Sequence, residues 1–256
     1  MKSIKSKTEI DLMRKSGEIL ALTLEKIKAA VKPGITTGEI DRIAEEFIRQ
    51  NGAIPSFKGY PCPIHGGVDY PGSVCASVNE EVVHGIPGLK ALKDGDIISI
   101  DVGVFLNGYH ADAARTYPVG NVSEDALKLI KVTEESFYKG ISYAVVGNRI
   151  VDISAAIQNC VEENGFSVVR DYIGHGIGKE LHEPPSIPNY VTKVKGWRLE
   201  PGMTFAIEPM VNQGAYDVKT LKNKWTVVTV DGSLSAHYEN TIAVTDNEPL
   251  VLTRLD

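Results

Sequence analysis

Apolar residues recur at every third or fourth position in two segments near the start of the chain, which is the period of a helix with one buried face. The first segment predicts a helix over Thr8–Ala30, which Pro33-Gly34 ends. The second predicts a helix that begins after Thr36 and ends at Asn51-Gly52. Both starts have the spacing of a capping box, in which an N-cap side chain and an acidic residue three positions later exchange hydrogen bonds. The predicted capping pairs are Thr8 with Asp11 and Thr36 with Glu39.

The pattern then repeats along the chain. Segment Gly34–Gly52 matches Gly147–Gly165 in length, and each contains an amphipathic helix that ends on Asn-Gly. Two further matches follow in the same order, His84–Ile86 with His175–Ile177 and Gly95–Asp101 with Gly202–Glu208. A helix precedes each copy, over Thr8–Ala30 and about Ser123–Tyr143. We therefore predict one domain, residues 1–256, built from two pseudo-repeats of about 8–120 and 121–245 that share a core.

Alternating residues between Asp96 and Tyr117 predict a β-hairpin with Asn107-Gly108 at its turn. In this register Gly103 pairs with Asp112, and Asp101 lies diagonal to Asp112 on the same face of the hairpin. The apolar residues on the opposite face would pack under a layer of helices. Two aspartates beside a glycine therefore indicate an open, acidic site on the face that the helices leave free.

The second half has acids at matching positions. Glu208 ends one predicted strand, and Glu239 lies within another, over Ser233–Thr245. By the repeat, Glu208 corresponds to Asp101 and Glu239 corresponds to Asp112. We expect the four carboxylates to meet where the two halves share their core.

Four converging carboxylates cannot all ionise unless cations lie among them. Two divalent ions would balance the four acids, as in two-metal hydrolases, whose ions lie about 3.5–4 Å apart. His175 would add one nitrogen ligand from a segment rich in glycine, where backbone and ligand can approach closely. Oxygen ligands with one nitrogen and no thiolate favour manganese, iron or cobalt, with zinc as a further option. The predicted metal ligands are Asp101, Asp112, His175, Glu208 and Glu239.

Composition and charge exclude several classes of protein. The 256 residues carry a formal net charge of −6, which argues against a surface for direct nucleic-acid binding. No apolar run approaches the roughly 18 residues of a membrane span, and no apolar signal-peptide core follows the basic start. The three cysteines are widely spaced, as expected of a protein in a reducing compartment. We therefore expect a cytoplasmic protein that does not bind membranes.

Six segments resemble those of the type I bacterial methionine aminopeptidases, which are M24 metallopeptidases with the pita-bread fold. The resemblance implies an α/β (α+β) fold of two pseudo-symmetric halves, with a curved antiparallel sheet covered by helices. It also implies removal of the initiator methionine from nascent polypeptides whose second residue is small. The segments that carry the resemblance are Val83–Pro87, Ile100–Gly103, Tyr109–Asp112, Gly174–Gly178, Pro201–Pro209 and Tyr238–Thr241.

The resemblance assigns a role to each predicted ligand. Asp112 and Glu239 would bridge the two metals and Asp101 would chelate one of them. His175 and Glu208 would complete the other. Glu208 would also take a proton from the attacking water and pass it to the leaving amine.

The resemblance further implies contacts with the substrate. His182 would stabilise the developing oxyanion, and His84 would contact the scissile amide. Relative to short family members, Pro61–Asp69 is expected to be an insertion of about seven residues. Leu181 stands where an aromatic residue is common in the family, and His237 stands where a glutamine can occur. An apolar pocket for the methionine side chain is expected to be lined by Tyr60, Tyr70, Cys75 and Trp225.

Three other interpretations stay open at this point. An X-Pro aminopeptidase of the same fold would carry an additional N-terminal domain, whereas here one helix precedes the first half. A non-catalytic peptide-binding relative would have lost ligands, whereas all five are present. An unrelated metal-binding module would match only by chance. The resemblance also implies a monomer that acts on nascent chains at the ribosome.

Overall fold

The structure is a computed structural model, and it describes residues 3–255. The elements of the first half are α1 (Lys7–Ala30), α2 (Thr37–Gln50), β1 (Ile54–Pro55), β2 (Val74–Val78), β3 (Glu81–Val83), β4 (Ile97–Leu106) and β5 (Tyr109–Pro118). Those of the second half are α3 (Glu124–Ile141), α4 (Ile150–Glu163), β6 (Ser167–Val168), β7 (Gly174–Gly176), β8 (Glu183–Ile187), β9 (Thr204–Ile207), β10 (Met210–Asn212), β11 (Val218–Thr220), β12 (Val227–Thr229), β13 (Ser235–His237), β14 (Asn240–Ala243) and β15 (Leu250–Val251).

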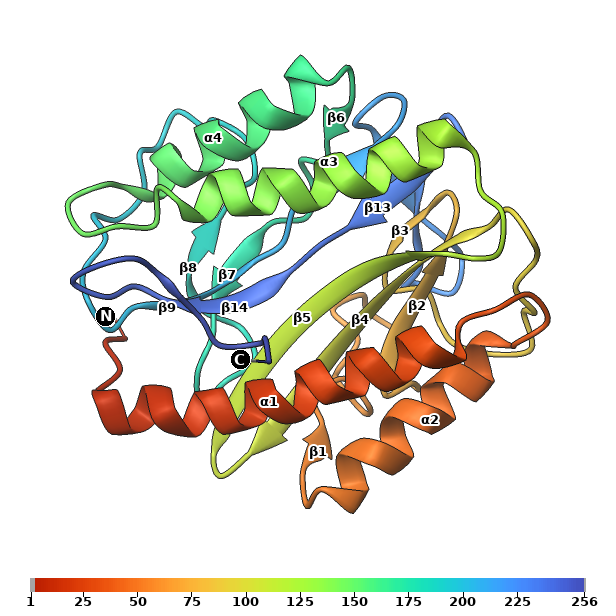
Figure 1. Ribbon diagram of the computed structural model, residues 1–256, viewed down its shortest axis with the longest axis horizontal. Coiled ribbons are helices and arrows are strands. Elements are labelled where there is room, and N and C mark those ends of the chain that lie inside the picture. Colours follow the sequence, from red (N-terminus) through yellow and green to blue (C-terminus); the bar gives the residue numbers. More distant parts are fainter. Residues whose placement is uncertain (1–2, 256) are drawn as a thin grey trace.

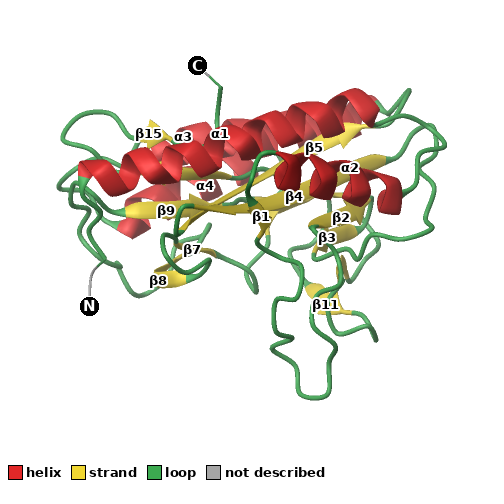
Figure 2. Cartoon of the chain, turned by 90° about the horizontal axis from the view of Figure 1, so that it is seen from below, coloured by secondary structure: helices red, strands yellow, loops and turns green. Residues whose placement is uncertain are grey.

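The helices cover one face of a curved layer of antiparallel strands, and loops extend from the other face (Figures 1 and 2). Helices α1 and α2 pack on β2, β4 and β5 through a core that includes Leu20, Ile40 and Ile100. Helices α3 and α4 pack on β9 and β14 through a second core that includes Phe137 and Phe205. Each half therefore buries its own helix pair against its own strands.

Helix α1 begins earlier than the sequence pattern suggested. Its capping box is formed by Ser6 and Glu9, so the predicted pair of Thr8 and Asp11 is wrong. The Ser6 hydroxyl accepts from the Glu9 amide, and the Glu9 carboxylate accepts from the Ser6 amide at 2.8 Å. The pairs Ser6–Glu9 and Thr8–Asp11 both have the sequence spacing of a capping box. The pair nearer the start of the chain forms the N-terminal cap of the helix. The second predicted box, Thr36 with Glu39, is confirmed.

The hairpin register agrees with the prediction. Asn107 and Gly108 both have positive φ, 52° and 86°, as a type I′ turn requires. Strands β4 and β5 then pair Gly103 with Asp112, which leaves Asp101 diagonal to Asp112 on one face. The apolar residues on the other face of β4 are buried under α1 and α2.

The strand predicted over Ser233–Thr245 is wrong as a single element. Strand β13 pairs with β10, whereas β14 pairs with β9, so the chain changes partner at Tyr238 and Glu239. The reason is a contact between the two halves: the backbone of Glu239 exchanges hydrogen bonds with Ala114 of β5, at 3.0 and 3.3 Å. This break places Glu239 at the seam where the sheet of one half meets the sheet of the other.

The expected loop at Pro61–Asp69 forms no helix or strand. It belongs to the long connection that follows β1 and extends away from the sheet beside β11 (Figure 2). The third predicted helix is α3, with Ser123 as its N-cap. Among the described residues, no helix is both long and apolar enough to cross a membrane.

Candidate metal centre

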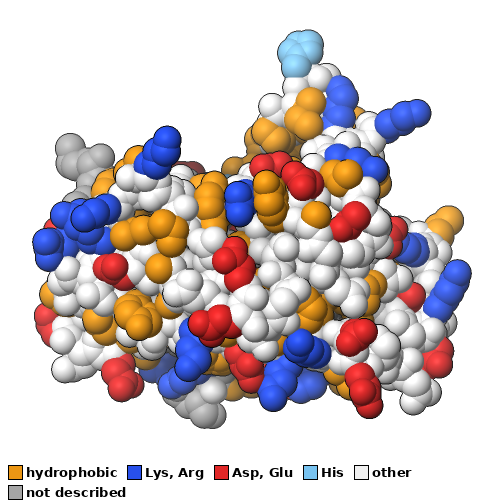
Figure 3. Space-filling view, turned by 90° about the horizontal axis from the view of Figure 1, so that it is seen from above, with side chains coloured by type: hydrophobic (Ala, Val, Ile, Leu, Met, Phe, Trp, Pro, Cys, Tyr) orange, Lys and Arg blue, Asp and Glu red, His pale blue; other side chains and the backbone are white. Residues whose placement is uncertain are grey.

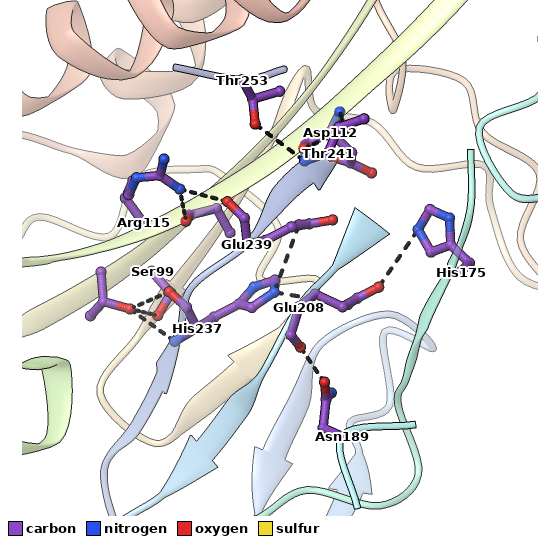
Figure 4. A network of polar contacts seen from close by, with 12 residues as sticks. Ser99, Asp112, Arg115, His175, Asn189, Glu208, His237, Glu239, Thr241 and Thr253 are labelled. Atoms are coloured by element: carbon purple, nitrogen blue, oxygen red, sulfur yellow. Dashed lines mark hydrogen bonds and ion pairs between the residues drawn. The ribbon is translucent and has the colours of Figure 1, made fainter. Parts of the chain in front are cut away.

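The predicted metal ligands come from five different places in the fold and meet around one cavity. Asp101 and Asp112 lie on adjacent strands of the first hairpin. Glu208 follows β9, Glu239 lies between β13 and β14, and His175 lies in β7. Four of these side chains surround a common space in Figure 4, with Glu208 and His175 pointing toward each other.

Distances among the ligand atoms suit a shared cation. His175 Nε2 lies 3.6 Å from Glu208 Oε1. The ligand atoms of Asp112, His175 and Glu239 all lie within 4.8 Å of one another. Asp101 and Glu239 form a second group of this size with His237. Glu239 belongs to both groups, which is the position expected of a bridging ligand.

The carboxylates lack the partners that buried oxygens require. Asp101 Oδ1, Asp112 Oδ1 and Glu239 Oε1 are buried and accept no hydrogen bond among the described residues. A buried polar atom left in this state costs about 1–3 kcal/mol, and more when charged. The guanidinium of Arg115 does not compensate, because it bonds the backbone oxygen of Glu239 and not the carboxylate. The donor set therefore fits divalent cations, which would satisfy these oxygens.

Burial dominates the electrostatics of the four acids. It raises the pKa of Asp101 to about 7. It also holds the pKa values of Asp112, Glu208 and Glu239 well above their ordinary range, and charge on the neighbouring carboxylates adds to the effect. Divalent cations among the acids would oppose both causes and keep the carboxylates ionised.

His175, the single predicted imidazole ligand, has the protonation state and orientation that metal binding requires. Burial is the main cause that lowers the pKa of His175 to about 3, so the ring is neutral at physiological pH. Its Nδ1 lies 2.8 Å from the carbonyl oxygen of Gly176, an arrangement that directs Nε2 toward the acids. The backbone at Glu208 is also held in place, because its carbonyl oxygen accepts a hydrogen bond from the Asn189 side chain at 3.0 Å.

One cavity of about 350 Å³ is lined by every residue that the sequence analysis predicted as a metal ligand, a catalytic group or a pocket residue. The acids form one part of its wall and apolar side chains form another. Tyr70 and Trp225 meet edge to face there, with ring centroids 5.1 Å apart, and the Tyr70 hydroxyl donates to Gly85 at 2.8 Å. The predicted residues on its wall, apart from the metal ligands, are Tyr60, Tyr70, Cys75, His84, His182 and Trp225.

The two other histidines lie at different depths in this cavity. His84 packs against Tyr172 and Trp225, and burial, followed by the charge of His182, lowers its pKa to about 4. His182 is exposed at the mouth, where its Nδ1 lies 2.7 Å from the Tyr60 hydroxyl. Its ring also contacts the ring of His175, with centroids 4.4 Å apart.

Comparison with known proteins places this arrangement in a family. The model of metallopeptidase family M24 matches residues 11–246. The methionine aminopeptidase of Clostridium perfringens is 60% identical over 98% of this chain and 98% of its own length. Methionine aminopeptidase 1 of Bacillus subtilis is 58% identical with the same coverage. This chain belongs to the methionine aminopeptidases of family M24. It is a metal-dependent hydrolase.

Solved structures agree with this family membership. The methionine aminopeptidase of Thermotoga maritima superposes with a TM-score of 0.95 and 44% identity, and the match covers 100% of both chains. A prolidase of Pyrococcus horikoshii superposes with a TM-score of 0.78 at 23% identity, over 64% of its length, which shows a shared fold alone. The expected pita-bread fold, with its curved antiparallel sheet, is confirmed.

The sequence analysis did not predict His237 as a neighbour of the candidate metal centre. His237 is buried, and its Nε2 lies 3.8 Å from Glu208 Oε2 and 3.7 Å from Glu239 Oε2 (Figure 4). The sequence places His237 two positions before Glu239, which is the spacing of one strand face. The strand ends before Glu239, however, so the contact depends on how the sheets meet and not on this spacing. Further residues of the cavity lining were not predicted as site residues, among them Phe57, Pro63 and Tyr172.

Proposed function

We propose that this chain removes the N-terminal methionine from nascent polypeptides, preferring a small second residue, by hydrolysis of the first peptide bond at a centre of two divalent ions. The observation that carries this function is the 60% identity to a methionine aminopeptidase over nearly the whole chain. An intact set of acids and imidazole around one cavity supports catalysis over a role in peptide binding alone. The X-Pro enzymes, at 23% identity or below, share the fold only.

The two ions are assigned to five side chains. Asp112 and Glu239 would hold both ions, Asp101 would hold one, and His175 with Glu208 would hold the other. Support comes from Glu239, which lies within reach of both ligand groups. Oxygen-rich ligands with a single nitrogen suit manganese, iron or cobalt, and zinc is also compatible. Bound divalent ions would polarise the scissile carbonyl and lower the pKa of the attacking water.

Glu208 is the proposed general base. It would accept a proton from the attacking water and later give it to the leaving amine. The Glu208 carboxylate lines the cavity beside the His175 ring, where it would be within reach of a water held at the centre. The neighbouring His175 and His237 lie within 4 Å of the Glu208 carboxylate and limit its movement.

Two histidines are proposed to contact the substrate amide. With the Tyr60 hydroxyl donating to Nδ1, the ring hydrogen of His182 lies on Nε2, where it can donate to the developing oxyanion. His84, neutral because burial lowers its pKa to about 4, would bond the scissile amide. The methionine side chain would lie against the apolar wall formed by Tyr60, Tyr70, Cys75 and Trp225.

The cellular setting is also part of the proposal. We place the chain in the cytoplasm as a monomer that meets its substrates as they emerge from the ribosome. The three free cysteines, Cys62, Cys75 and Cys160, fit a reducing compartment. The two halves are proposed to form a single domain, since the ligand set draws on both.

Peptide hydrolysis tests the function directly. Chelated protein should release no methionine from Met-Ala-Ser until manganese or cobalt is added back, and it should not cleave Ala-Pro-Ser. Glu208→Gln should lower kcat by about 10²–10⁴, since a positioned acid–base group contributes about that factor. Glu18→Gln, on the exposed surface of α1, is the matched control and should keep full activity. Metal-independent release, or a requirement for proline in second place, would contradict the proposal.

A further inference from the structure

A projecting loop borders the mouth of the catalytic cavity, and the functions assigned above make no use of it. The loop comprises residues 61–69, most of which are exposed. Its base is closed by two backbone hydrogen bonds, from Gly59 to the Tyr70 oxygen at 2.8 Å and from Tyr70 to the Tyr60 oxygen at 2.9 Å. The resulting projection stands well clear of the rest of the molecular surface and carries hydrophobic side chains (Figure 3).

The loop is held in place from its side. The indole Nε1 of Trp225 donates to the Val68 oxygen at 2.7 Å, and Lys224 Nζ donates to the His65 oxygen at 2.8 Å. Within the loop, the Gly67 amide donates to the Ile64 oxygen at 2.9 Å. Pro61 and Pro63 each fix one backbone dihedral. These contacts make the loop a fixed wall that the turn after β11 supports.

The wall is continuous with the cavity. Pro63 is part of the cavity lining, beside Tyr60, whose hydroxyl bonds His182. Farther out, Ile64 and Val68 are 41% and 80% exposed, so both side chains are open to a partner. Pro63 at the cavity mouth, with Ile64 and Val68 farther out, is referred to below as the apolar strip; basic side chains and a histidine lie on the same projection (Figure 3).

The part of the substrate peptide that follows the cleaved bond can lie along this strip. Its first residue lies inside the cavity, so the remainder of the peptide must leave through the mouth, past Tyr60 and Pro63. The rising half of the loop, about five residues, spans at most about 16 Å. An extended peptide advances about 3.3 Å per residue, so about five substrate residues match this length.

We propose that residues 61–69 form a binding surface for the substrate peptide downstream of the cleaved bond, one that favours apolar residues at about the fourth to sixth positions. This rests on the proposed function, because the direction of the peptide follows from methionine lying at the metal centre. The Ile64 and Val68 side chains are the contacts that select the downstream segment.

Two peptides and one pair of variants test this surface. We expect the wild-type chain to cleave Met-Ala-Ser-Val-Leu-Val with a kcat/KM several-fold above that for Met-Ala-Ser. Ile64→Ser combined with Val68→Ser should raise KM for the hexapeptide about five-fold and leave tripeptide hydrolysis unchanged. Leu89→Ser, at a 97% exposed apolar residue outside the cavity lining, is the control and should change neither.

A second variant removes the wall itself. Replacing residues 62–68 with two glycines, while retaining Tyr60 and Tyr70, should abolish the preference for the longer peptide, and circular dichroism would report its fold. Equal effects on both peptides, or an unchanged KM for the hexapeptide, would overturn the proposal. Failure of the wild-type chain to release methionine from the tripeptide would instead contradict the proposed function, so the two failures are distinguishable.

Discussion

Glu239 shows how one residue can depend on contacts far from it in the sequence. Its carboxylate has a buried oxygen without a hydrogen-bond partner, and its backbone is pinned between Ala114 and the guanidinium of Arg115. The backbone therefore cannot move to relieve the burial of the charge. The same holds for Asp112, whose backbone exchanges hydrogen bonds with the Thr241 hydroxyl at 2.8 and 2.9 Å. Fixed backbones keep the acids together even though their charges repel.

Metal removal should therefore produce a protein whose stability depends on pH. Burial raises the pKa of Asp101 to about 7 in the folded chain, against about 4 when unfolded. The folded state then binds more protons, so the free energy of unfolding should fall as pH rises from about 4 to about 7. Urea denaturation of chelated protein at pH 5 and pH 7 measures this effect. Asp101→Asn should weaken the dependence, whereas Asp125→Asn, at an exposed position, should not. Stability that rises with pH over this window would contradict the expectation.

At the scale of elements, the segment that carries His182 is held by the start of the chain. Lys5 Nζ pairs with Glu183 Oε2 at 2.5 Å, with side chains only 4% and 12% exposed. The other carboxylate oxygen of Glu183 accepts from the backbone amide of Lys179 at 2.9 Å, which closes the turn before His182. The Lys5 backbone in turn donates to the Gly202 oxygen at 2.7 Å. A residue outside the cavity thus positions a turn that borders it.

Breaking this ion pair should be costly. Lys5→Met leaves a buried carboxylate without its partner and should destabilise the fold by about 3 kcal/mol. The double variant Lys5→Met with Glu183→Gln removes both charges and should recover part of that loss. Urea denaturation gives the stabilities, and hydrolysis of Met-Ala-Ser by the folded variants reports whether His182 has moved. A single variant as stable as the wild type would show that the pair contributes nothing.

At the scale of the whole molecule, the two halves meet through strands and through the two ends of the chain. Strand β3 of the first half pairs with β12 of the second, and β5 bonds the backbone at Glu239. Helix α1 packs closely on the C-terminal segment at Gly17, where an added Cβ would lie 2.0 Å from the Leu252 oxygen. Each half therefore pairs with a strand edge of the other, and the backbone at Glu239 in the second half bonds to β5 in the first.

Separate halves should therefore not fold. Residues 1–120 and 121–256, expressed alone, should lack cooperative unfolding, because each would expose the strand edge that the other covers. Refolded together, they should recover metal-dependent release of methionine. Circular dichroism during thermal unfolding and hydrolysis of Met-Ala-Ser measure the two outcomes. Cooperative unfolding of either half alone would contradict the single-domain proposal.

The sequence by itself determined the features that local chemistry controls. Helical periodicity predicted α1 and α2, and Asn107-Gly108 predicted the hairpin register that places Asp101 beside Asp112, because a type I′ turn requires positive φ at both positions. The internal repeat then led to Glu208 and Glu239. These predictions depend on residues that lie close along the chain or on a copied pattern.

Only the tertiary structure decided the features that depend on how the two sheets meet. The break at Glu239, the approach of His237 to two carboxylates, and the contact of Tyr60 with His182 join segments far apart in the sequence. Their positions are set by non-local strand pairing and burial, which no spacing along the chain specifies. The choice of Ser6 over Thr8 as the cap of α1 likewise required the structure, since both have a suitable acid three residues later.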